Sequence, residues 1–144
     1  MAAHSLKKMI RIHAPEDRVF AYVADPAHNP EWMPNVVEVT NISGPQNVGT
    51  TWAYHYAFAG THHKGVARTT DYEQNKHIGV KTEGDIVSEW QFRFEPDGEY
   101  TRLTVEFEYN LSDSLLGKFE APVLRMLHDN ATEHALQNLK THLE

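Results

Sequence analysis

The chain of 144 residues contains no cysteine, and its 13 lysine and arginine residues are outnumbered by 20 aspartate and glutamate residues. Without thiols, the sequence excludes disulfide bonds, thiol nucleophiles and metal sites with cysteine ligands. The net charge of −7 argues against nucleic acid or an anionic membrane surface as a partner, since both select an excess of positive charge. We therefore expect no nucleic-acid binding.

Long apolar runs are also absent. No stretch approaches the roughly 20 apolar residues that span a bilayer, and the opening residues lack the apolar block and cleavage site of a signal peptide. These absences predict a cytoplasmic protein without stable membrane insertion. Repeats and linkers rich in glycine or serine are missing too, so residues 1–144 are predicted to form a single domain.

Ten histidines raise the question of a metal site, but their spacing does not fit one. His62 and His63 are neighbours on a predicted strand, so their side chains leave opposite faces. His128 and His134 are six residues apart on a predicted helix, whereas helical zinc motifs use the i, i+4 spacing. Phosphate-binding loops, dinucleotide glycine patterns and nucleophile elbows are missing as well. The sequence therefore predicts no metal and no cofactor.

The amino-terminal part of the sequence predicts a strand followed by two short helices. Residues 5–14 alternate in polarity loosely enough for a strand. Pro15 then suits the first turn of a short helix, which the step Asp25-Pro26 ends. A second short helix carries Trp32 and ends at Pro34. We expect this pair of short helices to close one end of a hollow.

The rest of the sequence predicts strands and then one long helix. From Val36 the apolar period changes to two, with turn signals between the apolar runs, which predicts six more strands. Short loops make these strands antiparallel. Helical spacing returns in the last third, at Leu124, Leu127, Ala131, Ala135 and Leu139. Pro122 fits the first turn of that helix, or kinks a longer helix that begins near Leu115.

Side-chain parity gives the predicted sheet one apolar face. The aromatic residues of the strand over residues 51–58 all share that face; they are Trp52, Tyr54, Tyr56 and Phe58. A two-residue turn at Gly60-Thr61 would set large side chains against small ones, with Tyr56 opposite Gly65 and Tyr54 opposite Ala67. The other face of the next strand is mostly charged or polar, so we expect it to be in contact with water.

A second predicted hairpin extends the apolar face. It pairs Phe94 with Leu103, Phe92 with Val105, and Trp90 with Phe107. A sheet with one apolar face and one amphipathic helix can close as a solid two-layer core or around a cavity. Gly65, Ala67 and Thr69 occupy positions where a solid core would contain valine or leucine, which favours the cavity.

Several stretches of the sequence together resemble a known superfamily. They are IHAPEDRVFAYVADPAHNPEW, GTTW, TDYE, the Pro-Asp-Gly turn with TRLTVEFEY, and the closing NATEHALQNLKTHLE. Over nearly the whole chain they resemble the START-like (SRPBCC) helix-grip superfamily, in its polyketide cyclase/dehydrase and lipid-transport branch. The resemblance implies an α+β fold, in which a curved seven-stranded antiparallel sheet grips a long C-terminal helix. It also implies an apolar small molecule between sheet and helix, with Trp32 near the mouth.

The predicted ligand pocket combines the inward-facing residues of the sheet with those of the long helix. Its members are Trp32, Trp52, Tyr54, Tyr56, Phe58, Ala67, Thr69, Trp90, Phe92, Val105, Phe107, Tyr109, Leu124, Leu127 and His128. Parity also turns the polar residues His63 and Ser88 inward. Each tyrosine has a simpler interpretation, as a core ring with one structural hydrogen bond.

Two residues are candidates for acid–base chemistry. Paired with Ile78 across a turn, Asp71 would be a carboxylate at the edge of an apolar cavity, where burial raises its pKa as a general acid requires. The alternative is a bulge that turns Asp71 to solvent. His128 projects near the apolar stripe of the long helix, as do Asn138 and His142. An imidazole there can be a base, or can be satisfied by a backbone carbonyl.

These patterns leave three hypotheses for function. The first is the binding or transport of an apolar small molecule, of a lipid, isoprenoid, quinone or polyketide-like class, by a monomer or weak homodimer. The second is a cyclase, dehydratase or hydrolase in the same cavity, using Asp71 or His128. The third is a co-chaperone-like interaction module. We place binding first, because apolar lining is abundant and the sequence does not set an acid beside a base.

Overall fold

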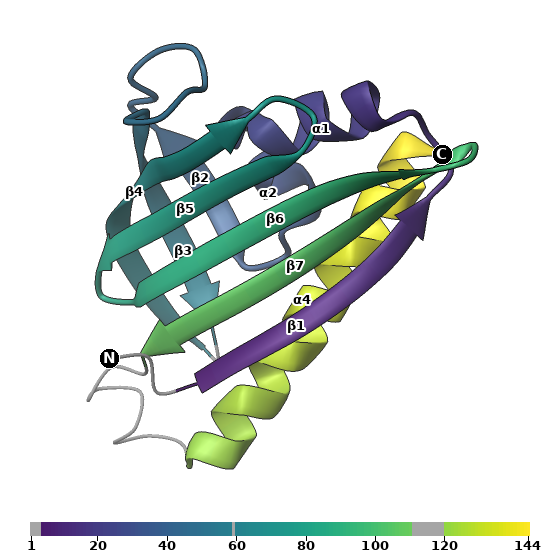
Figure 1. Cartoon of the computed structure of the whole chain (residues 1–144). Helices are drawn as coiled ribbons and strands as arrows, with labels where there is room; N and C mark the ends of the chain where they lie inside the picture. Colours follow the sequence, from purple (N-terminus) through teal and green to yellow (C-terminus); the bar gives the residue numbers. More distant parts are fainter. Residues whose placement is uncertain (1–3, 59, 111–119) are drawn as a thin grey trace.

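Seven antiparallel strands and one long helix dominate the fold (Figure 1). The structure is a computed structural model, and it describes residues 4–58, 60–110 and 120–144. The elements are β1 (His4–Ile12), α1 (Glu16–Ala24), the 3-10 helix η1 (Pro26–His28), α2 (Asn29–Trp32), β2 (Val36–Thr40), β3 (Thr51–Phe58), β4 (Thr61–Glu73), β5 (His77–Gly84), β6 (Val87–Asp97), β7 (Tyr100–Asn110) and α4 (Ala121–Leu143). The predicted order of elements is confirmed.

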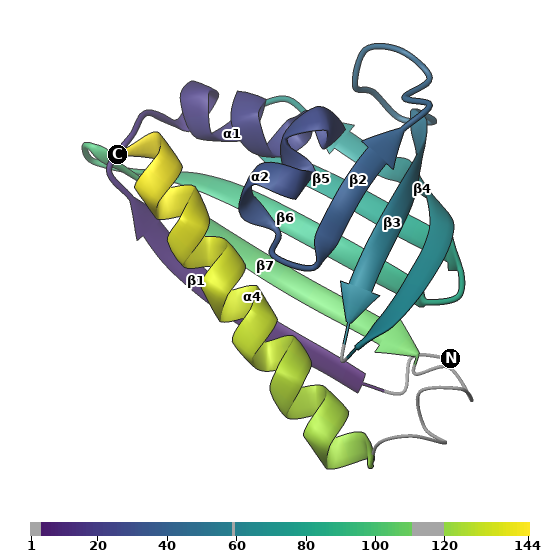
Figure 2. The same ribbon diagram turned by 180° about the vertical axis from the view of Figure 1, so that it is seen from behind.

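The strands form one curved sheet in the order β1-β7-β6-β5-β4-β3-β2. Helix α4 lies on the concave side, along β1 and β7, and α1 and α2 cover the upper end of the same side (Figure 2). The convex side faces the viewer in Figure 1. The α+β helix-grip fold with its seven-stranded sheet is therefore confirmed.

Local chemistry explains the two short helices. Pro15 is the N-cap residue of α1, and Val19 and Phe20 of that helix are buried in the core. After the break at Asp25, the Asp25 side chain accepts a hydrogen bond from the backbone N–H of Ala27 at 3.0 Å and so begins η1. Because α1, η1 and α2 follow one another so closely, the chain turns sharply over the end of the sheet.

Helix α4 begins at Ala121, with Pro122 in its first turn. The predicted longer helix from Leu115 would begin outside the described residues. The helix buries Leu124, Leu136 and Leu139 against the sheet side. Among the described residues, no helix is long and apolar enough to cross a membrane.

The register predicted for the β3–β4 hairpin is wrong by two residues. Phe58 pairs with Thr61, Tyr54 with Gly65, and Trp52 with Ala67. Strand β3 therefore ends at Phe58 and β4 begins at Thr61, so the predicted turn at Gly60-Thr61 is wrong. Because side chains alternate with period two, a slip of two residues keeps every side chain on its predicted face.

The other two predicted hairpin pairings have different outcomes. Between β6 and β7, the predicted partners Trp90 and Phe107 are confirmed, as are the other two pairs. Between β4 and β5, the predicted pairing of Asp71 with Ile78 is wrong. A β-bulge after Thr69 inserts one residue, so that Asp71 pairs with Gly79 and Tyr72 pairs with Ile78.

Candidate functional site

A cavity of about 120 Å³ lies between the concave face of the sheet, α4 and the short helices. Its walls come from β2 to β7, from α1 and α2, and from the middle of α4. Most residues of the predicted pocket line it, namely Trp32, Trp52, Tyr54, Tyr56, Ala67, Trp90, Phe92, Val105, Phe107 and His128. Their contact with a ligand stays a prediction.

Five residues of the predicted pocket lie outside the cavity lining. They are Phe58, Thr69, Tyr109, Leu124 and Leu127. Phe58 and Leu124 form a separate buried cluster, against which Leu127 packs. The ring of His128 stacks on Phe58 at 3.9 Å between centroids and lies 4.3 Å from the Tyr109 ring. Phe58 and Tyr109 therefore pack against the His128 ring, whereas Thr69 donates a hydrogen bond to Gln46.

An aromatic stack makes up the wall on β6 and β7. The Trp90 ring stacks on Phe107 at 3.8 Å and lies nearly parallel to Phe92 at 5.8 Å. Trp32 meets Phe92 edge to face at 6.3 Å. Such contacts hold large rings in fixed orientations, so this wall offers a flat and well-ordered apolar surface.

A chain of hydroxyl groups forms a polar patch next to this aromatic wall, beside Trp90. The indole N–H of Trp90 donates to Ser88 Oγ at 3.2 Å, and Ser88 Oγ lies 2.5 Å from Thr82 Oγ1. Thr82 Oγ1 and the Tyr54 hydroxyl both donate to the carbonyl oxygen of Ile86, at 3.0 and 3.3 Å. Burial raises the pKa of Tyr54. The hydroxyl protons of this patch are therefore donated to acceptors within the protein.

Tyr56 forms a second polar point in the lining. Its hydroxyl oxygen accepts a hydrogen bond from Asn35 Nδ2 at 3.3 Å. Burial raises the pKa of Tyr56 to about 12, against the opposing effect of the Asn35 hydrogen bond. The phenol therefore keeps its proton throughout the physiological pH range.

His128 is the titratable residue of α4 that lines the cavity, with 2% of its surface exposed. Its Nδ1 lies 3.2 Å from the carbonyl oxygen of Leu124. Because a carbonyl oxygen only accepts, Nδ1 carries the proton and Nε2 holds the lone pair of the neutral ring. The predicted alternative, in which a backbone carbonyl satisfies the imidazole, therefore holds for Nδ1.

Gln46 is a lining residue that the sequence analysis missed. Its Nε2 donates to the carbonyl oxygen of Ala24 at 2.7 Å, and its Oε1 accepts from the hydroxyl of Thr69 at 2.6 Å. It lines both the cavity and a second hollow between α1 and the loop over residues 41–50. No periodic pattern marks a loop residue, so the sequence held no signal for it.

Four lining residues of α4 were not in the predicted pocket either. They are Ala131, Thr132, Ala135 and Leu136. Ala131 and Ala135 were part of the predicted apolar stripe, and their small side chains leave space opposite the aromatic wall. Small residues at the centre of an amphipathic stripe are the signal that could have placed the cavity on this part of the helix.

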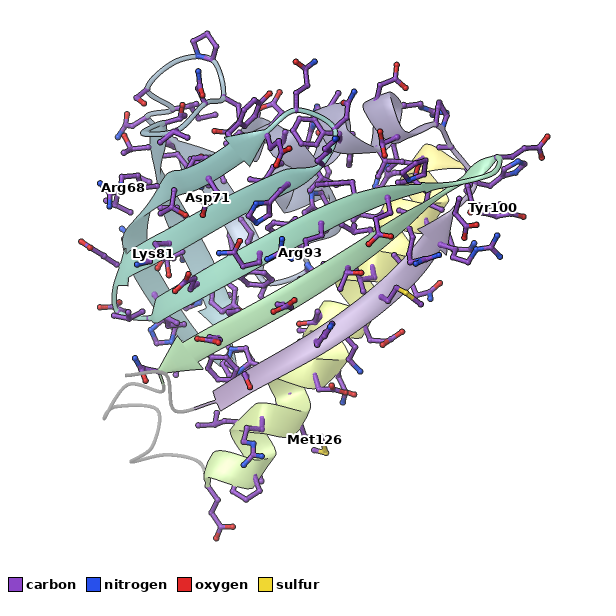
Figure 3. All side chains as sticks on the ribbon, in the orientation of Figure 1. Arg68, Asp71, Lys81, Arg93, Tyr100 and Met126 are labelled. Carbon is purple, nitrogen blue, oxygen red and sulfur yellow. The ribbon has the colours of Figure 1, made fainter. Side chains whose placement is uncertain are left out.

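Asp71 lies on the convex face of the sheet, away from the cavity (Figure 3). Its side chain is exposed, and Oδ2 accepts a hydrogen bond from the hydroxyl of Thr70 at 3.0 Å. The bulge after Thr69 turns it outward, as the alternative interpretation expected. Lys81 and Arg93 are exposed on the same face.

The remaining polar candidates have structural partners. His63 is buried, with Nε2 at 2.7 Å from Thr61 Oγ1, and it does not line the cavity. Asn138 donates to the carbonyl oxygen of Trp32 at 3.1 Å, which ties α4 to α2. His142 lies 3.2 Å from the carbonyl oxygen of Glu31. Within the described part of the chain, no three His, Asp or Glu side chains gather in a way that could hold a metal ion.

Comparisons with known proteins agree with this architecture. The model of a protein family described as polyketide cyclase / dehydrase and lipid transport matches residues 3–144. No curated protein sequence matches the chain.

Solved structures of similar fold cover nearly all of the chain. The protein TTHA0849 from Thermus thermophilus is 18% identical over 97% of both chains, with a TM-score of 0.83. A START superfamily protein from Mycobacterium smegmatis is 17% identical over 98% of this chain and 97% of its own, with a TM-score of 0.80. The Zhui aromatase/cyclase from Streptomyces sp. R1128 is 16% identical over 97% and 90%, with a TM-score of 0.73.

Proposed function

Because the chain belongs to the polyketide cyclase/dehydrase and lipid-transport family, we propose that it binds or carries an apolar small molecule in the cavity between sheet and α4. The ligand is of a lipid, isoprenoid, quinone or polyketide-like class. The observation that carries this proposal is the composition of the cavity wall. Aromatic and aliphatic side chains make up most of the lining, with a few polar groups at separate points, as in typical small-molecule sites.

The size of the cavity bears on the ligand. An engineered apolar cavity of about 150 Å³ takes up benzene, so a volume of about 120 Å³ suits one ring or a short hydrocarbon segment. Because the lining also reaches Pro34 and Asn35 at the turn before β2, a longer ligand extends from this space toward the end of the sheet. The flat wall of Trp90 and Phe107 favours a planar group there.

A second candidate is a cyclase or dehydratase that acts on such a ligand. The observation that favours it is the position of His128, an imidazole in the cavity wall whose Nδ1 lies 3.2 Å from the carbonyl oxygen of Leu124. An aromatase/cyclase is among the proteins of similar fold. Asp71 has no part in this candidate, because its carboxylate is on the convex face.

Native mass spectrometry of the purified full chain tests the proposal, together with titration by a fatty acid and a panel of polycyclic aromatics. We expect a co-purifying small molecule, or a panel member that binds once per chain and changes the emission of the three tryptophans, all of which line the cavity. Absence of any bound mass, with unchanged emission across the panel, overturns the proposal. Turnover of a polyketone that His128→Asn abolishes while binding persists would favour the second candidate.

A further inference from the structure

We infer that the ligand carries a carbonyl oxygen, and that this oxygen accepts a hydrogen bond from the phenol of Tyr56. The inference rests on the proposed function of the cavity and deepens it. It narrows the ligand from any apolar molecule to a ketone, quinone or similar carbonyl compound. The protons of the two phenols at the cavity wall have different partners.

The hydroxyl of Tyr56 has a proton to donate. A phenol has one O–H proton and two oxygen lone pairs. Asn35 Nδ2 donates to one of those lone pairs, so the Tyr56 proton points elsewhere. Among the described residues, none accepts a hydrogen bond from that proton. Since Tyr56 lines the cavity, the acceptor is expected from the ligand.

The neighbouring phenol gives an internal comparison. Tyr54 lies two residues earlier on β3, faces the same side and also lines the cavity. Its proton is directed to the carbonyl oxygen of Ile86. Of the two phenols in the lining, Tyr56 therefore has the available proton. The indole N–H of Trp32 also lacks an acceptor in the described structure, but protein atoms cover its nitrogen completely.

The surroundings of the Tyr56 proton should make the site select among ligands. Burial keeps the phenol protonated, with a pKa of about 12, so it acts as a donor and never as a phenolate. A donor that a bound ligand shields from water without offering an acceptor is costly, so a ligand that leaves the Tyr56 proton unpaired binds less well. A hydrocarbon of the same shape supplies no acceptor, whereas a ketone supplies one. The site should therefore prefer the ketone to the hydrocarbon.

A matched pair of probes and a matched pair of variants test the inference. The dissociation constants of 1-indanone and indane are measured by calorimetry on the parent chain, on Tyr56→Phe and on Tyr54→Phe. We expect the preference for 1-indanone over indane to fall about fivefold in Tyr56→Phe, as for the loss of one hydrogen bond. In Tyr54→Phe it should stay within about twofold of the parent. An unchanged preference in Tyr56→Phe overturns the inference.

A second variant keeps the phenol and redirects its proton. In Asn35→Asp, a carboxylate replaces the amide beside the Tyr56 oxygen and accepts the phenol proton, so the preference for 1-indanone should fall as it does in Tyr56→Phe. Retention of the full preference in Asn35→Asp contradicts the inference, even if Tyr56→Phe fails to fold. If the parent binds both probes without preference, only the carbonyl inference is wrong. If it binds neither, the proposed function fails with it.

Discussion

The phenol of Tyr54 lies directly over Gly65, its partner across the β3–β4 hairpin. A Cβ atom on Gly65 would stand 2.5 Å from the Tyr54 hydroxyl oxygen and 2.7 Å from its Cζ, and it would also collide with the carbonyl oxygen of Glu83. The missing side chain at Gly65 is what allows the phenol to cross β4 and reach the carbonyl of Ile86.

Gly65→Ala should therefore destabilise the fold by about 1–3 kcal/mol, as for other overpacked sites. Part of the obstruction is backbone, which cannot rotate away. Urea unfolding measures the change, and Val66→Ala is the control, because Val66 is adjacent on β4 but 51% exposed and should change stability by less than about 0.5 kcal/mol. Equal stability of Gly65→Ala and the parent would show that Tyr54 does not occupy this position.

Gln46→Ala removes the side chain that joins the loop over residues 41–50 to α1 and β4. The hydroxyl of Thr69, which is 1% exposed, and the carbonyl of Ala24 would both lose their partner. We expect a loss of about 1–3 kcal/mol in the free energy of unfolding and faster ligand release, because Gln46 stands between the cavity and the second hollow.

Stopped-flow displacement of a bound fluorescent fatty acid measures that release rate. The control is Asn47→Ala in the same loop, whose side chain does not line the cavity. If Gln46→Ala has the stability and the release rate of the parent, Gln46 forms no barrier between the cavity and the second hollow.

Asp71→Asn should change neither ligand binding nor any turnover in the cavity. The carboxylate is exposed on the convex face and bonds to Thr70, so its neutralisation should alter stability by less than about 0.5 kcal/mol. Binding titration and, if a reaction is found, its rate are compared with those of the parent. A variant that folds normally but loses turnover would place Asp71 in the chemistry despite its position.

Stability at high pH should depend on Tyr56. Its pKa is about 12 in the folded chain and about 10 for an exposed phenol, so the unfolded chain releases this proton first. The contribution of Tyr56 is therefore fully present below about pH 10 and is lost as the pH rises toward 12. Burial raises the pKa of Tyr54 and Tyr109 as well, and these phenols act in the same direction.

Urea unfolding at several pH values between 9 and about 11.5 checks this prediction, with ultraviolet absorbance reporting phenolate formation. Tyr56→Phe should show a shallower loss of stability over that range than the parent. Equal slopes for the two proteins would mean that the Tyr56 phenol titrates as an exposed one.

Much of the fold could be predicted from the sequence, because the periods of strands and helices identify the buried face even where a predicted pairing is shifted. The hairpin at β3 and β4 illustrates this: the predicted pairing of Tyr54 with Ala67 was wrong, yet Tyr54 still faces inward, since a slip of two residues preserves parity. The pairing of Trp90 with Phe107 was confirmed outright, because the Pro-Asp-Gly signal fixed that turn.

The site was less predictable, because it depends on single irregular residues. One extra residue at the bulge after Thr69 reversed the side of Asp71, and nothing in the composition of β4 marks that insertion. Gln46 comes from a loop without a period. The surroundings of His128 could not be predicted either, because Phe58 stacks on its ring and Tyr109 lies tilted beside it, and these contacts join residues far apart in the sequence.

Filling the cavity from the protein side tests the central claim most directly. Ala67 is 2% exposed, lines the cavity and lies between Trp52 and Thr82 on the neighbouring strands. In Ala67→Phe the added ring should enter the empty space and recover contacts that the cavity lacks. The outward-facing neighbour Ala53 gives the control variant Ala53→Phe, which should leave the cavity unchanged.

The decisive measurement is thermal unfolding and fatty-acid titration on the same samples of the parent, Ala67→Phe and Ala53→Phe. The proposed ligand cavity predicts that Ala67→Phe keeps or raises the melting temperature while its affinity falls at least about tenfold, and that Ala53→Phe binds like the parent. An Ala67→Phe protein that melts lower, as an overpacked solid core does, and still binds as tightly as the parent would contradict a ligand cavity at this place.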